Sequence, residues 1–222
     1  MNLDDFRVLA KTASAVFSGP LEQRLNQADA QLGDGDTGVT LRRVFERIAE
    51  TALLPHADIG ALFSACGRAS ASATGSSLGT LCAVGLLQAG KQCAGRDQLG
   101  AADLGPLLSN VRATMQARGK AQLGDKTVLD MLEAIAKTLT AQADPNRQAL
   151  AAASAALETL NEFRGKPCRI GRARVFGDRS IGLDDPGMLA LAELTFAIAK
   201  PSEKLSAAGS LSGLASHESA QG

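Results

Sequence analysis

Apolar residues recur every three to four positions along most of this 222-residue chain, which is the spacing of one face of an α-helix. Leu41, Val44 and Ile48 follow this spacing with charged residues between them, and the segment from Val128 repeats it. Proline after Gly19 and after Asp144 suits the first turn of two further helices. We expect helices at 3–17, 20–30, from 41 onward, 57–72, 75–93, 102–117, from 128 onward, 145–160 and 185–200.

The patterns typical of β-strands are weak. Only 168–170 and 174–176 have an extended character, and glycine and arginine interrupt both. The sequence therefore predicts an all-α protein with one domain at 1–200. Residues 201–222 are rich in Ser, Ala and Gly, and we expect them to be a disordered tail.

Polar, glycine-rich segments lie between the expected helices, at 33–38, 72–80, 118–127 and 165–187. If the helices run alternately up and down, connections that are two helices apart emerge at the same end. The four segments are therefore expected to converge on one site.

Composition limits the possible partners. Lys plus Arg and Asp plus Glu both number 23, and aromatic residues make up 3%. A chain with no net charge and few stacking groups is not expected to bind nucleic acid or an anionic membrane. No apolar run is long enough to span a bilayer. The four cysteines form no C-x-x-C pair, which favours reduced, packed thiols and the cytoplasm.

The segment 26–38 carries three carboxylates, Asp29, Asp34 and Asp36, within eight residues. Crowded carboxylates without basic neighbours repel one another, and a hard divalent cation such as Mg²⁺ relieves that repulsion. A helix end followed by a polar turn explains the same composition equally well. An EF-hand loop from Asp34 is excluded, because its sixth and twelfth positions hold Val39 and Phe45.

Two more segments are ambiguous alone. Residues 118–127 nearly match a P-loop, but Asp125 intrudes before Lys126-Thr127 and a helix precedes the loop. An anion site at a helix start and a helix N-cap at Asp125 both remain open. Residues 73–80 are small and hydroxyl-rich, which suits either an approaching phosphate or close helix packing.

The last segment, 177–187, contains Arg179. The planar guanidinium group of arginine binds two phosphate oxygens at once. A lone arginine in a loop is otherwise simply solvated.

Taken together and in this order, the four segments resemble the L subunit of dihydroxyacetone kinases. The family pattern is an Asp, four residues and Gly-Asp-x-Asp-His-Gly, then Gly-Ala-Ser-Gly, Arg-Gly-Lys-x-x-x-Gly-Asp-Lys-Thr and Gly-x-Arg-Ser-x-Gly-x-x-Asp-Pro-Gly-Ala. The resemblance implies an up-and-down barrel of about eight helices with ATP or ADP bound at one end. It implies two Mg²⁺ ions on Asp29, Asp34 and Asp36, with Arg179 as a catalytic residue. The nucleotide-binding residues that it implies are Thr37, Gly38, Thr40, Thr74, Gly75, Gly119, Gly124, Thr127, Arg179, Asp185 and Pro186.

Three positions depart from that family pattern. Thr37 replaces a histidine, Thr40 replaces the usual asparagine, and Met188 replaces an alanine. Metal binding is expected to survive these changes. We expect altered contacts to the nucleotide at the two threonines, and Met188 is expected to crowd the nucleotide.

The resemblance also implies transfer of a phosphoryl group to a short-chain ketose that a histidine of a separate K-type subunit holds. Neither His56 nor His217 lies in a motif of this chain, so it is expected to be inactive without that partner. A phosphocarrier subunit is implied if ADP stays bound. Two alternatives are a regulatory protein that binds nucleotide without catalysis, and the nucleotide module of a related kinase such as fatty-acid kinase.

Overall fold

The computed structural model describes residues 1–200, and every regular element within them is helical. The predicted all-α class is confirmed. The elements are α1 (Leu3–Phe17), α2 (Pro20–Ala30), α3 (Thr37–Ala52), α4 (Ile59–Ala73), α5 (Ser77–Gln92), α6 (Ala101–Arg118), α7 (Val128–Ala141), α8 (Pro145–Arg164), the 3-10 helix η1 (Arg172–Ser180) and α9 (Pro186–Ala199).

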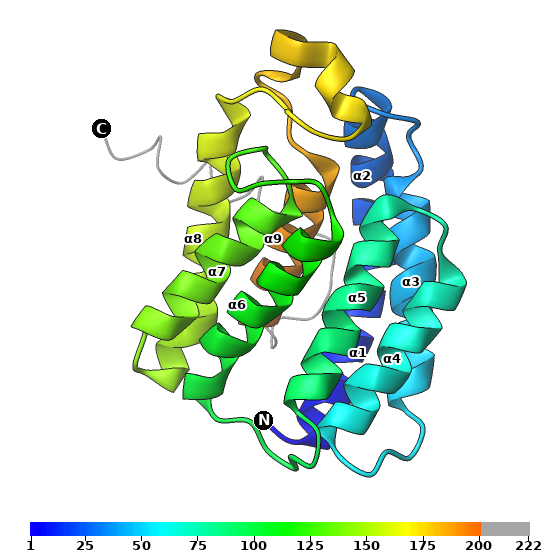
Figure 1. The fold of residues 1–222 in the computed structure, drawn as a ribbon, viewed down its shortest axis with the longest axis vertical. Helices are drawn as coiled ribbons and strands as arrows, with labels where there is room; N and C mark the ends of the chain where they lie inside the picture. The colour runs from blue at the N-terminus through cyan, green and yellow to red at the C-terminus, as the bar shows by residue number, and fades with distance from the viewer. Residues whose placement is uncertain (201–222) are drawn as a thin grey trace.

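The nine α-helices of the described part form a barrel of eight staves, because α1 and α2 make up one broken stave. Both helices pack against α3, and Figure 1 shows α2 continuing in the direction of α1. The break occurs at Ser18 and Gly19, where Pro20 starts the new helix. Each stave packs on the next, and α9 returns to α1 and α2, so the ring closes. The predicted up-and-down barrel is thus observed.

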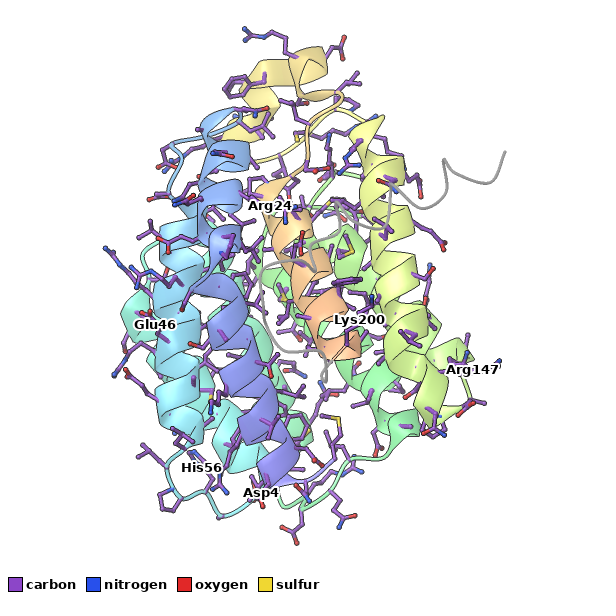
Figure 2. All side chains as sticks on the ribbon, turned by 180° about the vertical axis from the view of Figure 1, so that it is seen from behind. Asp4, Arg24, Glu46, His56, Arg147 and Lys200 are labelled. Atoms are coloured by element: carbon purple, nitrogen blue, oxygen red, sulfur yellow. The ribbon has the colours of Figure 1, made fainter. Side chains whose placement is uncertain are left out.

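A partly buried ion pair joins the last stave to the first. Arg24 of α2 donates a hydrogen bond of 2.6 Å to Glu193 of α9, whose carboxylate is largely buried. Figure 2 shows Arg24 at the seam between the two helices. This pair links α2 to the middle of α9.

The core consists of the helical faces that the spacing predicted. Leu41, Val44 and Ile48 of α3 are buried, as are Met131 and Ile135 of α7. The barrel also contains a partly open cavity of about 560 Å³, whose walls are leucine and other mostly apolar residues. The interior is therefore mostly apolar.

Helices α3, α5, α7 and α9 all begin at the same end of the barrel, which we call the loop end (Figure 1). Its connections are residues 31–36, 74–76, 119–127 and 165–185, and η1 lies over them. The predicted convergence of four loops at one end is confirmed. We call the other end the turn end; its connections are 53–58, 93–100 and 142–144.

Some local details differ from the sequence expectation. Helix α3 begins at Thr37 rather than near Leu41, so Thr37, Gly38 and Thr40 lie in its first turn. Of the two segments with a weak extended character, 174–176 lies in η1, which has a kink at Gly177 where φ is 52°, and 168–170 is irregular. The four cysteines are all unpaired, as predicted. The tail at 201–222 lies outside the described residues, and none of the described helices is long and apolar enough to cross a membrane.

Candidate functional site

Three carboxylates meet at the loop end. Asp29 lies in the last turn of α2, and Asp34 and Asp36 lie in the connection to α3. One carboxylate oxygen from each lies within 4.8 Å of the others. Asp29 is half-buried, whereas Asp34 and Asp36 are exposed. The structure thus brings the predicted metal ligands together, and their role as ligands stays a prediction.

Glycines make this turn possible. A side chain at Gly33 would place its Cβ 2.5 Å from Oδ1 of Asp29, so any other residue would push this carboxylate away. Gly35 has φ of 78°, in the left-handed region that glycine adopts without strain. The chain can therefore reverse within four residues and return Asp34 and Asp36 to the side of Asp29.

The start of α3 is capped by side chains of α2. Asp29 Oδ2 accepts the N–H groups of Asp36 and Thr37 at 3.0 and 3.2 Å. Asn26 Oδ1 accepts those of Gly38 and Val39 at 2.8 and 3.3 Å. These bonds fix Asp29 and leave the carboxylate of Asp36 without a capping role. They also engage the amides of Thr37 and Gly38, so a nucleotide would meet the Thr37 hydroxyl rather than these amides.

Gly38 has a packing role in addition to its predicted nucleotide role. A Cβ at this position would collide with the carbonyl oxygen of Glu22 and with the Asn26 side chain. The glycine therefore lets α3 approach α2 closely. Its contact with nucleotide stays a prediction, as does that of Thr40.

An ion pair across the loop end was not foreseen from the sequence. Arg172, the first residue of η1, pairs with Asp34. The Arg172 guanidinium lowers the pKa of Asp34 below its ordinary value. The charge of this carboxylate is thus favoured, and η1 is tied to the acidic cluster. The arginine-rich stretch from Arg169 to Arg174 was a usable signal, but the sequence could not show which carboxylate it faces.

The second loop opens α5. Thr74 Oγ1 accepts the N–H of Ser76 at 3.1 Å, and Ser76 caps α5 by accepting the N–H of Gly79 at 3.0 Å. A Cβ at Gly79 would collide with Thr74, whereas a Cβ at Gly75 would meet nothing within 4 Å. Close packing therefore explains Gly79, and open space lies beside Gly75, where the nucleotide was predicted.

The third loop opens α7. The N-cap is Thr127, not Asp125, so the alternative that made Asp125 the cap is wrong. Asp125 instead accepts the N–H of Gln122 at 2.7 Å. Buried Asp130 accepts the N–H groups of Gly124 and Thr127 at 2.5 and 2.8 Å. These amides therefore already have partners, and Asp130, which no sequence motif singled out, shapes the loop.

The fourth segment carries the predicted phosphate partner. Arg179 is exposed on η1, with its guanidinium 5.5 Å from the centre of the Phe176 ring. Among residues 1–200, no carboxylate forms an ion pair with its guanidinium. Its charge is therefore available to an anionic ligand.

Asp185 and Pro186 begin α9. Asp185 Oδ1 accepts the N–H of Met188 at 2.8 Å, and burial raises the pKa of Asp185 to about 6. A Cβ at Gly187 would lie 3.4 Å from Leu78 of α5 and 3.5 Å from Val128 of α7. The starts of α5, α7 and α9 therefore meet at this point, which unites the second, third and fourth segments.

Met188 does not have the role that was expected of it. Its side chain is fully buried in the core with Met131 and Leu189. The N-terminal turn of α9 points this side chain into the barrel, so it fills the interior instead of crowding the nucleotide. The prediction of a steric effect at Met188 is therefore wrong.

These features make the loop end suited to a magnesium nucleotide. Four helix N-termini point toward this end, and each carries a partial positive charge that favours anions such as phosphate. The three carboxylates are hard oxygen donors with room for water and phosphate oxygens, as Mg²⁺ requires. The residues present therefore fit both the metal and the nucleotide.

Comparisons with known proteins agree with this geometry. Residues 31–200 match the DAK2 domain. The ADP-binding subunit DhaL of the PEP-dependent dihydroxyacetone kinase of Escherichia coli (strain K12) is 30% identical over 177 residues, which is 78% of this chain and 84% of that subunit. The L-erythrulose 1-kinase of Mycolicibacterium smegmatis is 33% identical over 187 residues, or 80% of this chain and 32% of that protein.

Solved structures give the same result. The dihydroxyacetone kinase of C. freundii, crystallised with AMP-PNP and Mg²⁺, aligns with a TM-score of 0.69 and 28% identity, over 88% of this chain and 33% of that chain. Its native form gives a TM-score of 0.71. The chain thus spans about a third of the single-chain kinases and most of the separate ADP-binding subunit.

Proposed function

This chain belongs to the DAK2 domain family, and on that premise we propose that it is the nucleotide-binding subunit of a kinase for a short-chain ketose. The observation that carries the proposal is the meeting of three carboxylates and four helix N-termini at one end of the barrel. The names of the relatives, kinases of dihydroxyacetone and of erythrulose, indicate the class of substrate.

Asp29, Asp34 and Asp36 would hold two Mg²⁺ ions between them and the phosphates of ATP or ADP. Bound magnesium supplies neutralisation of the phosphate charge and polarises the group that is transferred. Asp29 is fixed by the amides of Asp36 and Thr37, so it forms the rigid side of the site. Asp34 would have to release Arg172 in order to bind a metal ion.

The other residues of the loop end would surround the nucleotide. Thr74 and Gly75 lie at the start of α5, Gly119 and Thr127 flank the third loop, and Asp185 and Pro186 begin α9. Arg179 would contact the phosphoryl group during its transfer, because its guanidinium is exposed and has no carboxylate partner among the described residues. Charge stabilisation of this kind acts mainly in the transition state.

The ketose would be held by a K-type subunit. His56 lies at the turn end, far from the loop end (Figure 2). Its Nε2 is 2.9 Å from the carbonyl oxygen of Thr51. His217 lies outside the described residues. The names of several ADP-binding relatives, which are PEP- or PTS-dependent, support a phosphocarrier subunit that renews the phosphate on bound ADP.

Calorimetric titration with ADP tests the nucleotide site. Binding should require Mg²⁺, because the carboxylates repel free phosphate. Equal affinity in Mg²⁺ and in EDTA would contradict the metal assignment.

Reconstitution tests the subunit role. The chain alone with ATP and dihydroxyacetone should show no turnover, and addition of a K-type subunit should start the reaction, either with ATP or with ADP and a phosphocarrier. Robust turnover by the chain alone would contradict the two-subunit proposal.

One observation favours a second candidate, a nucleotide-binding regulator without catalysis. Thr37 and Thr40 stand in the first turn of α3, beside the acidic cluster, at positions where the family pattern has histidine and asparagine. This candidate predicts magnesium-dependent ADP binding but no turnover with any K-type partner or phosphate donor.

A further inference from the structure

Lys126 has a position that neither the motif nor the proposed function explains. In the sequence it occupies the place of a phosphate-binding lysine in a P-loop. In the structure it is 1% exposed, and its Nζ donates hydrogen bonds to the carbonyl oxygens of Lys166 and Ser180, at 2.8 and 3.0 Å. The ammonium group is therefore bound inside the protein rather than presented to a phosphate.

The two acceptors lie at the two ends of one segment. Lys166 lies two residues after the end of α8, and Ser180 ends η1. Between them lie Arg172, which pairs with Asp34, and Arg179, the predicted catalytic residue. A single ammonium group thus closes the base of the segment that carries both arginines.

Further bonds fasten the same base. Ser180 Oγ accepts the N–H of Cys168 at 2.8 Å and donates to the carbonyl of Gly177 at 2.5 Å. The N–H of Arg169 donates to the carbonyl of Asp125 at 3.1 Å. Lys126 therefore stands at the junction between the third loop and η1.

This arrangement has a conformational cost. Lys126 has φ of 66° and is the only residue other than glycine with positive φ among residues 1–200. Its burial lowers the pKa of the ammonium group, which the nearby carboxylates Asp185 and Asp184 partly offset. Strain and a buried charge in one residue persist only where the surroundings stabilise them, and they are concentrated at functional sites.

We propose that Lys126 is a positioning residue that holds η1 over the loop end, so that Arg179 faces the bound nucleotide. The inference rests on the proposed kinase function. Without the two carbonyl contacts, the base of the segment opens and Arg179 samples positions away from the phosphoryl group. Nucleotide binding by the three carboxylates does not depend on this closure.

A spin label on η1 measures the effect without any assay of turnover. Val175 is 72% exposed, so Val175→Cys accepts a nitroxide on the surface. The four native thiols should react slowly, because burial raises the pKa of Cys66 to about 11 and that of Cys82 to about 12 and also raises those of Cys93 and Cys168. Lys126→Met should increase the mobility of the label.

The matched control is Lys166→Met. The ammonium of Lys166 contacts Glu162 on the surface, while its carbonyl accepts from Lys126. This variant removes a lysine from the same segment but keeps the closure. It should leave both label mobility and turnover unchanged.

A double-mutant cycle tests whether Lys126 acts through Arg179. With a K-type partner, Lys126→Met should lower kcat by about 10- to 100-fold and change Mg–ADP affinity by less than about 3-fold. In the Arg179→Ala background the same substitution should lower kcat little further. Multiplicative losses, or unchanged label mobility, would overturn the inference.

Ser180→Ala serves if Lys126→Met does not fold. It removes the Oγ contacts to Cys168 and Gly177 but leaves Lys126 in place. It should increase label mobility and lower kcat, both to a smaller extent. If neither label mobility nor kcat changed, the inference would be overturned. If the wild-type chain did not bind Mg–ADP at all, the proposed function would be contradicted instead.

Discussion

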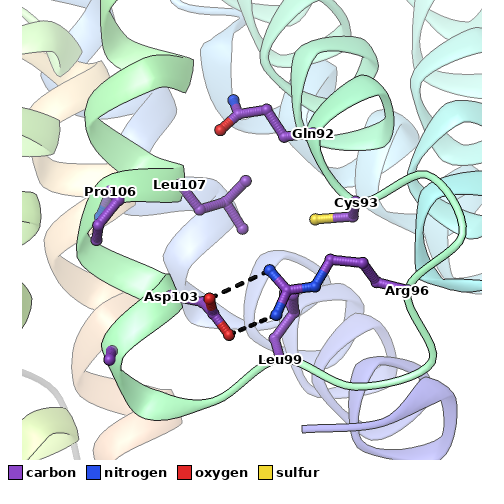
Figure 3. A pocket seen from close by; sticks show the side chains of 8 residues that line it. Gln92, Cys93, Arg96, Leu99, Asp103, Pro106 and Leu107 are labelled. Carbon is purple, nitrogen blue, oxygen red and sulfur yellow. Dashed lines mark hydrogen bonds and ion pairs between the residues drawn. The ribbon is translucent and has the colours of Figure 1, made fainter.

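The two ends of the barrel contain similar residue types but use them differently. At the turn end, Arg96, Asp103 and the N-terminal ammonium group have partners inside the chain. Arg96 donates from both terminal nitrogens to the two carboxylate oxygens of Asp103, at 3.1 and 2.8 Å (Figure 3). The N-terminal ammonium donates to the carbonyl of Leu99 at 2.6 Å. The small cavity beside this ion pair, about 140 Å³, is lined by residues of this turn and of the adjoining ends of α5 and α6.

At the loop end, the charged groups face outward. Asp34, Asp36 and Arg179 are exposed, and of these three only Asp34 has an ion-pair partner among the described residues, Arg172. The three carboxylates lie close together despite their like charges. Satisfied charges stabilise a fold, whereas crowded or unpaired charges need a ligand. The difference supports the proposal that the loop end binds ligand while the turn end is structural. Substitutions at each end can break or sharpen this contrast.

The largest effect is expected at the acidic cluster. Asp36→Ala removes a predicted ligand that has no capping role, so affinity for Mg–ADP should fall on the order of 10³-fold without loss of folding stability. Calorimetry and thermal unfolding measure both. Asp103→Ala at the turn end is the control and should show the reverse: lower stability with unchanged affinity. If both variants lost affinity equally, the contrast between the ends would fail.

The next effect concerns Arg179. Arg179→Ala, assayed with a K-type partner, should lower kcat by about 10²-fold with a smaller change in ADP affinity. Arg179→Lys should rescue only part of this loss, because an ammonium cannot make the two-pronged contact. Steady-state kinetics and calorimetry check both variants. An equal loss in affinity and in kcat/KM, with kcat unchanged, would make Arg179 a plain binding residue.

A smaller effect is expected at the turn end. Asp58 caps α4 by accepting the N–H of Ala61 at 2.6 Å, and it also accepts the N–H of Gly95 at 3.0 Å. Asp58→Ala should therefore lower the free energy of unfolding by about 1–2 kcal/mol. Denaturant unfolding measures the loss. Mg–ADP affinity should stay the same, and a change in it would show that the ends are coupled.

The smallest effect is a dependence of stability on pH at Asp185. Burial raises the pKa of Asp185 to about 6, while Lys126 opposes this shift and Asp130 adds to it. The folded protein therefore binds more protons than the unfolded chain between about pH 4 and pH 6. The stabilisation by this carboxyl group is complete below about pH 4 and is lost as the pH rises through about 6.

Asp185→Asn tests this assignment, because asparagine keeps the cap on Met188 without a charge. The variant should gain about 1 kcal/mol relative to the wild type between pH 4 and pH 7, since a half-buried carboxylate keeps part of its hydration. Denaturant unfolding across this range, without Mg²⁺ or nucleotide, measures the difference. A constant difference from pH 4 to pH 7 would contradict the assignment.

The sequence alone determined the helices and the end at which the loops meet. Helical periodicity and the prolines that begin α2, α8 and α9 are local signals, so they can be recognised without the tertiary structure. Alternation of the helices then placed the four polar segments together. The carboxylates of Asp29, Asp34 and Asp36 were predictable as a group, because eight residues with three glycines nearby cannot separate them far.

Only the tertiary structure decided which partner each polar side chain has. Asp34 pairs with Arg172, Lys126 binds carbonyls 40 and 54 residues away, and Met188 points into the core. No local pattern encodes these choices, because they depend on how irregular loops from distant parts of the chain pack against one another. A helix is stabilised by bonds to its own near neighbours, whereas a loop side chain is stabilised by whatever group the fold places within its reach.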